Sequence, residues 1–201
     1  QIQSTEHAFA AVLADGSVVT WGNPRFGGDS SAVQGQLLKV QKIQAARGPM
    51  IGGAFAAILA DGKVVTWGDP KYGGDSSEVQ DQLIDVQDIH STSSSFAARL
   101  ANGRVVTWGS KDFGGDSSMV QDQLIDVQKL QSAHGPFGGA FAAILAGGKV
   151  VTWGDSRSGG DSTAVQDQLK HVRHLQVTGS AFAAILADGT VVTWGDPRYG
   201  G

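Results

Sequence analysis

One phrase recurs five times along this chain, and that repetition limits the available folds more than any other feature. A clear copy reads AFAAILADGKVVTWG, from Ala54 to Gly68, and every copy ends on a Trp-Gly pair. Self-similarity at a period of about 20 to 50 residues indicates a repeat architecture, in which each unit buries its apolar face against the next. The Trp residues, separated by 46, 41, 45 and 41 positions, are Trp21, Trp67, Trp108, Trp153 and Trp194.

A second marker, V-Q-x-[IL], recurs with the same alternation and suggests where the units begin. We expect a single array of five units, 1–41, 42–87, 88–128, 129–173 and an incomplete 174–201. The chain begins with Gln rather than Met, which favours a piece of a longer polypeptide. The extra residues of the long units always precede the AFAAIL-type segment, so a double repeat of 86 or 87 residues is an alternative period.

Each unit contains two apolar β-like runs separated by a turn signal. In the second unit these runs are AFAAIL, at 54–59, and KVVTWG, at 63–68, with Asp61-Gly62 between them. Asp-Gly between such runs favours a hairpin with a type I′ turn, in which both central residues have positive φ. The segment around VQKIQ, at 40–44, alternates apolar and polar residues and predicts a third short strand.

A polar segment, GGDSSEVQDQL at 73–83, follows the hairpin and predicts a short helix. Asp75 is the expected N-cap, and Val79 and Leu83 follow it at helical spacing. About two turns of helix are marginal in isolation, so this segment must pack on the sheet. The equivalent N-cap residues in the other units are Asp29, Asp116 and Asp161.

These elements predict a mainly β protein with short helices, built as tandem β-propeller-like blades. A two-sided β-solenoid with the double repeat is the alternative. The 29 Gly residues, about twice the usual share, fall mostly at fixed positions of the unit, so they do not indicate a linker or disorder.

The composition also excludes several functional classes. With no Cys, the chain has no disulfide framework, no thiol nucleophile and no Cys-based metal site. A net charge of -4 gives no overall electrostatic footprint for nucleic acid. No apolar run reaches the ~18 residues of a membrane span, and no targeting segment is visible, so we expect a soluble protein of unknown compartment.

The phrase A-x-L-A-D-G-x-V-V-T-W-G, a Gly-containing loop and a V-x-x-[IL] strand together resemble the repeat of the regulator of chromosome condensation family. The resemblance covers essentially the whole chain, and near-identical arrays of this phrase are similar to a divergent algal or protist branch. It implies propeller blades and a scaffold that presents loops to protein partners, with a small GTPase as a partner by analogy. The GGDSSxVQDQL half and the shorter period depart from the family pattern.

No catalytic constellation and no cofactor motif is present, and near-identical units argue against an asymmetric active site. We therefore predict a non-enzymatic repeat scaffold for protein–protein interaction or structural assembly, without cofactor, metal or nucleic acid. Two alternatives are a guanine-nucleotide-exchange or regulatory module for a small GTPase, and a lectin-like array that stacks ligands on its Trp row. The Gly-Gly-Asp turns recur too rarely for the stacked ligands of a calcium β-roll.

The loops before the second and fourth hairpins are the most individual segments of the chain. Each carries an apolar residue between Gly and Pro residues, and such a residue anchors a partner when it is exposed. Self-association through the open array ends is a further expectation. The Trp row and the four Asp residues are expected to be structural. The candidate partner-binding residues are Arg47, Pro49, Met50, His134, Pro136 and Phe137.

Overall fold

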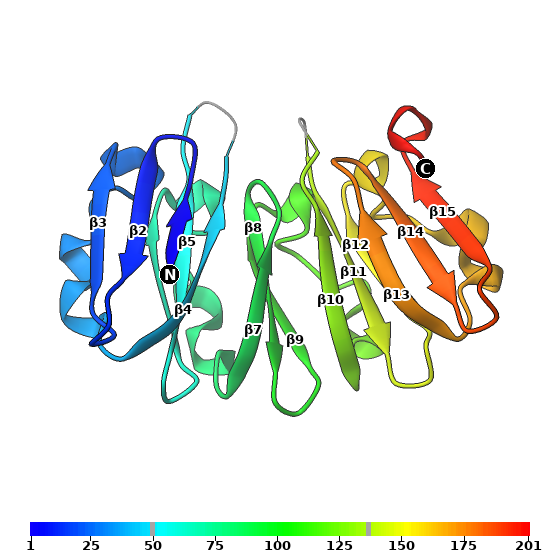
Figure 1. Ribbon diagram of the computed structural model, residues 1–201, viewed down its shortest axis with the longest axis horizontal. Helices are drawn as coiled ribbons and strands as arrows, with labels where there is room; N and C mark the ends of the chain where they lie inside the picture. Colours follow the sequence, from blue (N-terminus) through cyan, green and yellow to red (C-terminus); the bar gives the residue numbers. More distant parts are fainter. Residues whose placement is uncertain (49–50, 136–137) are drawn as a thin grey trace.

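Each repeat forms its own sheet of three antiparallel strands, and the five sheets stand side by side as an arc (Figure 1). The computed structural model describes residues 1–48, 51–135 and 138–201. Within every sheet the strand order follows the sequence. The building unit is therefore the single repeat, and the predicted mainly β architecture of tandem propeller-like blades with short helices is confirmed.

The strands of the five sheets are β1 (Ile2–Ser4), β2 (Ala8–Val12) and β3 (Val18–Gly22); β4 (Val40–Ala46), β5 (Ala54–Leu59) and β6 (Val64–Gly68); β7 (Val86–Ser91), β8 (Ser95–Leu100) and β9 (Val105–Gly109); β10 (Val127–Ala133), β11 (Ala140–Leu145) and β12 (Val150–Gly154); and β13 (Val172–Val177), β14 (Ala181–Leu186) and β15 (Val191–Gly195).

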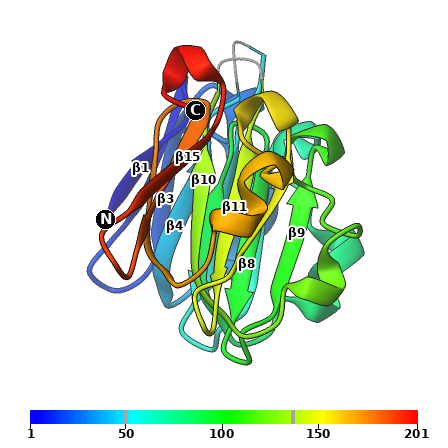
Figure 2. The same cartoon turned by 90° about the vertical axis from the view of Figure 1, so that its right-hand side faces the viewer.

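In the described part of the chain the helices are short 3₁₀ segments that follow the third strand of a sheet, and Figure 2 shows most of them on one side of the strands. They are η1 (Pro24–Phe26), η2 (Ser31–Gln36), η3 (Pro70–Tyr72), η4 (Ser77–Gln82), η5 (Lys111–Phe113), η6 (Gln121–Gln123), η7 (Ser156–Ser158), η8 (Thr163–Gln168) and η9 (Pro197–Tyr199).

The first strands of successive sheets contact one another, so β1, β4, β7, β10 and β13 together form one surface, here called the inner face. The 3₁₀ helices lie on the opposite side, against the third strands (Figures 1 and 2). The apolar core lies between neighbouring sheets, where small Ala side chains of one sheet meet Phe, Val and Trp of the next. Each repeat is thus held mainly by its neighbours.

The repeated Trp joins each sheet to the one before it. Trp108 stacks on Phe96 with ring centroids 5.2 Å apart, and its Nε1 donates a hydrogen bond to the Gly73 carbonyl, 3.1 Å away. Gly73 has φ +88°, and a Cβ there would lie 2.6 Å from Phe96 Cδ2. The same bond joins Trp67 to Gly27, Trp153 to Gly114, and Trp194 to Gly159, at 3.0, 3.1 and 2.9 Å.

A chain of polar side chains ties the second 3₁₀ segment of a repeat to its sheet. Thr107 Oγ1 lies 3.0 Å from Ser117 Oγ, which donates to Gln121 Oε1, and Gln121 Nε2 donates to the Val105 carbonyl. The same chain recurs in the first, second and fourth repeats. These bonds explain why the first Gln of the V-Q-x-Q segment recurs. The sequence pattern alone did not explain this residue.

The hairpin turn of the second repeat differs from the predicted type I′ geometry. Gly62 has φ +78°, whereas Asp61 has negative φ. Gly62 N donates to the Leu59 carbonyl, and Leu59 N donates to the Lys63 carbonyl. This pattern is a three-residue loop with a type I turn followed by Gly, so the type I′ prediction was wrong for this turn. Asp61 Oδ1 instead accepts a hydrogen bond from Lys63 N at 3.2 Å.

The repeated Asp was expected to be the N-cap, but in the second repeat it lies one residue before the observed N-cap. Ser76 occupies the N-cap position of η4, and Asp75 Oδ1 accepts a hydrogen bond from Ser77 N at 2.9 Å. That bond to an exposed carboxylate lowers the pKa of Asp75. The bond recurs at Asp29, Asp116 and Asp161, so the residue stabilises the entry to the 3₁₀ segment as an Asx turn.

Candidate functional site

The inner face carries a row of polar side chains, one from each inner strand. Each inner strand places one residue opposite the second Ala of the AFAA-type segment. This residue is Gln in four repeats and His90 in the third. The row consists of Gln3, Gln44, His90, Gln131 and Gln176.

The third repeat also departs from the others two residues earlier, where Asp88 pairs with Arg99 across β7 and β8. The corresponding pairs are Lys42 with Ile58 and Lys129 with Ile144. Arg99 Nη2 donates to Asp88 Oδ2, and both side chains are about three-quarters buried. Asp88 Oδ1 and Arg99 Nε are buried without a hydrogen bond to the described residues.

His90 lies beside this ion pair, with its Nε2 3.8 Å from Asp88 Oδ1. Burial lowers the pKa of His90, Asp88 opposes that effect, and the nearby cations Lys42 and Arg99 lower the pKa further. The imidazole is therefore neutral at pH 7 and offers one donor and one acceptor.

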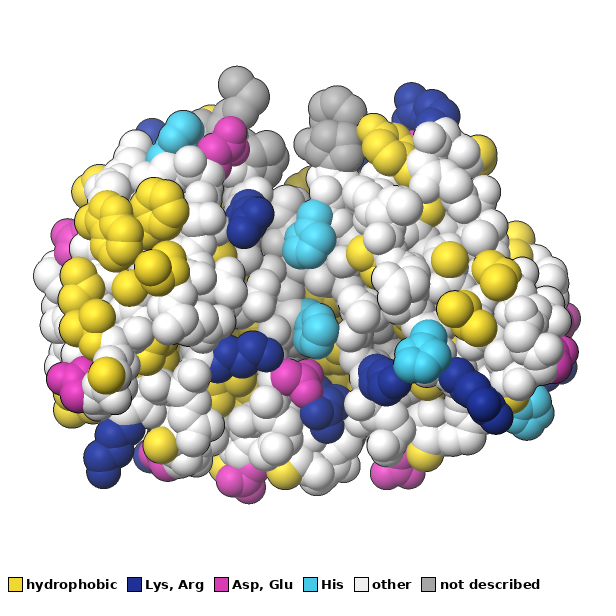
Figure 3. All heavy atoms as spheres, viewed as in Figure 1, with side chains coloured by type: hydrophobic (Ala, Val, Ile, Leu, Met, Phe, Trp, Pro, Cys, Tyr) yellow, Lys and Arg dark blue, Asp and Glu magenta, His cyan; other side chains and the backbone are white. Residues whose placement is uncertain are grey.

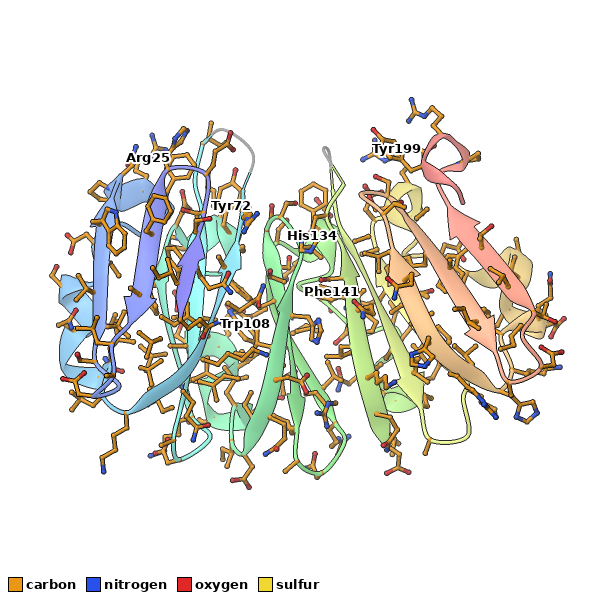
Figure 4. All side chains as sticks on the ribbon, in the orientation of Figure 1. Arg25, Tyr72, Trp108, His134, Phe141 and Tyr199 are labelled. Carbon is orange, nitrogen blue, oxygen red and sulfur yellow. The ribbon has the colours of Figure 1, made fainter. Side chains whose placement is uncertain are left out.

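A cavity of about 550 Å³ opens on the same face, between the first four repeats, and its lining includes Gln3 and the acidic Glu6 of the first repeat. Arg47 and His134, two of the predicted partner-binding residues, both line it. The Arg47 Nε donates to the Ser4 carbonyl at 3.0 Å, and His134 Nε2 lies 3.4 Å from Ser132 Oγ. Figure 4 labels His134 near the middle of the arc. Burial lowers the pKa of His134, and the positive charge of Arg47 lowers it further.

The other four predicted partner-binding residues, Pro49, Met50, Pro136 and Phe137, lie outside the described residues. Among the residues that are described, no three His, Asp or Glu side chains gather as metal ligands would. None of the described helices has the length and apolar character needed to cross a bilayer.

A second cavity of about 550 Å³ lies between η4 and β9 on the helix side. Its lining includes Thr107, Ser117 and Gln121, which already form the repeated hydrogen-bond chain that ties η6 to its sheet. Because these side chains already form hydrogen bonds with one another, we assign them a structural role at this cavity. The inner face is the better candidate site because its polar side chains differ between repeats and face an open surface.

The Trp row does not form a stacking platform for ligands. The four Trp side chains of the second to fifth repeats are at most 5% exposed, and only Trp21 of the first sheet is open to solvent. A lectin-like array requires exposed aromatic faces. In the second to fifth repeats this row is instead packed between neighbouring sheets.

The inner-face ion pair can be tested against the chain's own repeats. Arg99→Ile leaves the Asp88 carboxylate buried beside an apolar side chain, and we expect a loss of about 1 to 3 kcal/mol in unfolding free energy. The double variant Asp88→Lys/Arg99→Ile recreates the Lys–Ile pair of the second and fourth repeats and should recover most of that loss. Urea unfolding followed by Trp fluorescence measures both. A double variant no more stable than Arg99→Ile would contradict this account.

Comparisons with known proteins identify the fold. No protein-family model and no curated protein matches the sequence. Human WBSCR16 is 15% identical, with a TM-score of 0.54 over 97% of this chain and 61% of that one. Prp20p from Saccharomyces cerevisiae is 18% identical, with a TM-score of 0.55 over 97% of this chain and 57% of its own. The ectodomain of the receptor kinase CR4 from Physcomitrella patens is 16% identical, with a TM-score of 0.53, 96% of this chain and 51% of that chain being covered.

Prp20 is the yeast RCC1, so the chain has an RCC1-like repeat fold. It spans between about half and three-fifths of the length of these solved structures. At these identities the likeness shows the fold alone.

Proposed function

We propose that this chain is a non-enzymatic repeat module that binds an acidic segment of a protein partner on its inner face. One observation carries the proposal: the inner strands carry three Lys or Arg residues and one acidic residue, Asp88, although the chain as a whole has a net charge of -4. The exposed cations Lys42, Lys129 and Arg173 lie on β4, β10 and β13, and Arg47 follows β4 directly. Figure 3 shows Lys, Arg and His side chains gathered across the middle of this face, with an acidic side chain among them.

The chemistry of these groups suits carboxylates. A guanidinium such as that of Arg47 binds a carboxylate through two parallel hydrogen bonds. His134, at the same cavity, is able to take up a proton when an acidic group binds beside it. A basic patch on an acidic protein also steers acidic partners into one orientation, because the rest of the surface repels them.

The comparisons support an interaction role of this kind. The structure of Prp20p is described together with its binding to Gsp1p and histones, and yeast RCC1 has been solved with Kap60 bound. A regulatory role toward a small GTPase is the narrower alternative and rests on that likeness. Membership of an algal or protist branch of the family is likewise part of the proposal.

The proposal is tested with a fluorescein-labelled poly-glutamate peptide, titrated by anisotropy into the 201-residue chain at about 0.05 M salt. We expect saturable binding that the triple variant Lys42→Gln/Lys129→Gln/Arg173→Gln weakens about tenfold or more. The matched control is Lys63→Gln/Lys149→Gln/Arg198→Gln, which removes the same charge from hairpin turns and η9. We expect the control to bind nearly as the wild type does.

Three results would overturn the proposal. The first is an absence of peptide binding by the wild-type chain. The second is an equal loss in both triple variants, which would show that net charge alone decides. The third is tighter binding of a single-stranded oligonucleotide of matched charge, which would point to a nucleic acid instead of a protein.

A further inference from the structure

The third repeat combines two departures from the pattern of the inner strands. Its member of the polar row is His90, whereas the other four repeats carry Gln at that position, and a Gln amide does not titrate. Two residues earlier, Asp88 stands where β4 and β10 carry Lys42 and Lys129. An acid and the one residue of the row that titrates near neutral pH therefore lie on the same strand.

The Asp88 carboxylate has one oxygen that the ring of His90 is placed to satisfy. Arg99 Nη2 bonds to Oδ2, while Oδ1 is buried and accepts no hydrogen bond from the described residues. His90 Nε2 lies 3.8 Å from Oδ1, beyond hydrogen-bond distance. A protonated imidazole has N–H groups on both ring nitrogens, so a small movement of the charged ring gives Oδ1 its missing donor.

The surroundings of His90 keep it neutral in the free chain. Burial has the largest effect and lowers the pKa of His90, whereas Asp88 on the same strand raises it. The positive charges that lower this pKa further come from neighbouring elements and are Lys42 of β4, Arg99 of β8 and His134 directly after β10. The β5 strand, which also contacts β7, carries no charged residue. Lys129 of β10 turns toward β13, with its Nζ 3.5 Å from the Arg173 carbonyl.

The ring of His90 also reaches the surface of the inner face, since its side chain is 31% exposed. A carboxylate that arrives at the exposed side of the ring adds a second negative charge beside it. Two carboxylates favour the imidazolium more than Asp88 does alone. The Lys and Arg side chains of the inner strands stay charged throughout the neutral pH range, so they do not produce this effect. His90 is thus the residue of the polar row whose charge a bound acid changes.

We propose that His90 takes up a proton when an acidic segment binds across the inner face, and that this binding therefore tightens as the pH falls. The inference rests on the proposed function, because it names how the same site is regulated. Asp88 and a carboxylate of the partner hold the imidazolium between them. The Gln residues of the other repeats contribute to the same surface without responding to pH.

The direction of the pH effect follows from the two states of His90. In the free chain its pKa lies below the ordinary value, and a bound carboxylate raises that pKa. Well above both values the ring is neutral with or without the partner, and the affinity does not depend on it. As the pH falls between the two values, only the complex holds the proton, so the affinity rises. We expect a gain of about three- to tenfold between about pH 8 and about pH 6.

The test repeats the anisotropy titration with the labelled poly-glutamate peptide at about pH 8 and about pH 6, where glutamate carboxylates stay ionised. Calorimetry in two buffers of different ionisation enthalpy counts the protons taken up on binding. His90→Gln places the residue of the other repeats in the row. It should bind as the wild type does at the higher pH, lose at least half of the gain at the lower pH, and take up fewer protons. His134, at the neighbouring cavity, supplies the remainder.

Two further variants separate His90 from general charge. His171→Asn removes an exposed His from the loop before β13, at a φ of +57° that Asn tolerates, and it should keep nearly the full gain. Asp88→Lys/Arg99→Ile makes the inner face more positive but takes the carboxylate away from His90. This double variant should bind at least as tightly as the wild type at the higher pH, yet show a smaller gain at the lower pH.

A wild-type affinity that is the same at both pH values would overturn the inference and leave the proposed function standing. An equal gain in His90→Gln would also overturn it, because another group would then take up the proton. A wild-type chain that binds the peptide at neither pH would overturn the proposed function, and this inference with it.

Discussion

Gly73→Ala is expected to lower the unfolding free energy by about 3 kcal/mol or more, measured by urea unfolding with Trp fluorescence. Two costs combine. The φ of +88° at Gly73 is unfavourable for any residue with a Cβ, and that Cβ would lie 2.6 Å from Phe96 Cδ2. The Phe96 ring cannot move away easily, because it is fully buried and stacked on Trp108.

Gly200→Ala is the matched control for that prediction. Gly200 has nearly the same backbone conformation, with φ +96°, but an added Cβ would meet nothing within 4 Å. Only the backbone cost of about 1 to 2 kcal/mol remains. The difference between the two variants therefore measures the contact between repeats. Equal losses would show that the backbone conformation, and not the packing of the next repeat, requires glycine here.

The repeat period and the local patterns were enough to predict the blades. Trp67 and Trp108 recur at one position of the unit, and a side chain repeated in every copy is most simply explained as a contact between copies. The segments AFAAIL and VVTWG fall in strands at the expected residues. These features depend on residues close in sequence, which is why they could be read without the structure.

Turn geometry and capping were harder to predict because they depend on single hydrogen bonds. Asp61-Gly62 is compatible with two hairpin turns, and the hydrogen bond from Lys63 N to the Asp61 carboxylate accompanies the three-residue loop. Asp75 and Ser76 are both common N-cap residues, and the choice between them depends on where the 3₁₀ segment begins.

The inner face was predicted only in part. Arg47 and His134 were chosen as loop residues, but their convergence on one cavity depends on the curvature of the arc. The Asp88–Arg99 pair was missed because its partners are 11 residues apart and face each other only through the register of β7 and β8, which contains a bulge. Aligning the repeats position by position would have shown both residues departing together from the Lys–Ile pair.

The last prediction separates the burial of the repeated Phe from its stacking on Trp. Phe96→Ala should lower the unfolding free energy by about 3 to 5 kcal/mol, as expected for a large-to-small change in a packed core. Phe9→Ala removes the same ring from an equivalent stack, since the interplanar angles are 17° for Phe96–Trp108 and 16° for Phe9–Trp21. Phe9 is 44% exposed, however, whereas Phe96 is fully buried.

Stacking by itself is worth about 0.5 to 1.5 kcal/mol, so Phe9→Ala should cost no more than about 2 kcal/mol. The rest of the stability loss expected for Phe96→Ala comes from removing a ring that is buried against the preceding sheet. Similar losses in the two variants would assign the stability to the stack within each repeat. The repeats would then be independent units, and the cooperative contact between neighbours would lose its energetic basis.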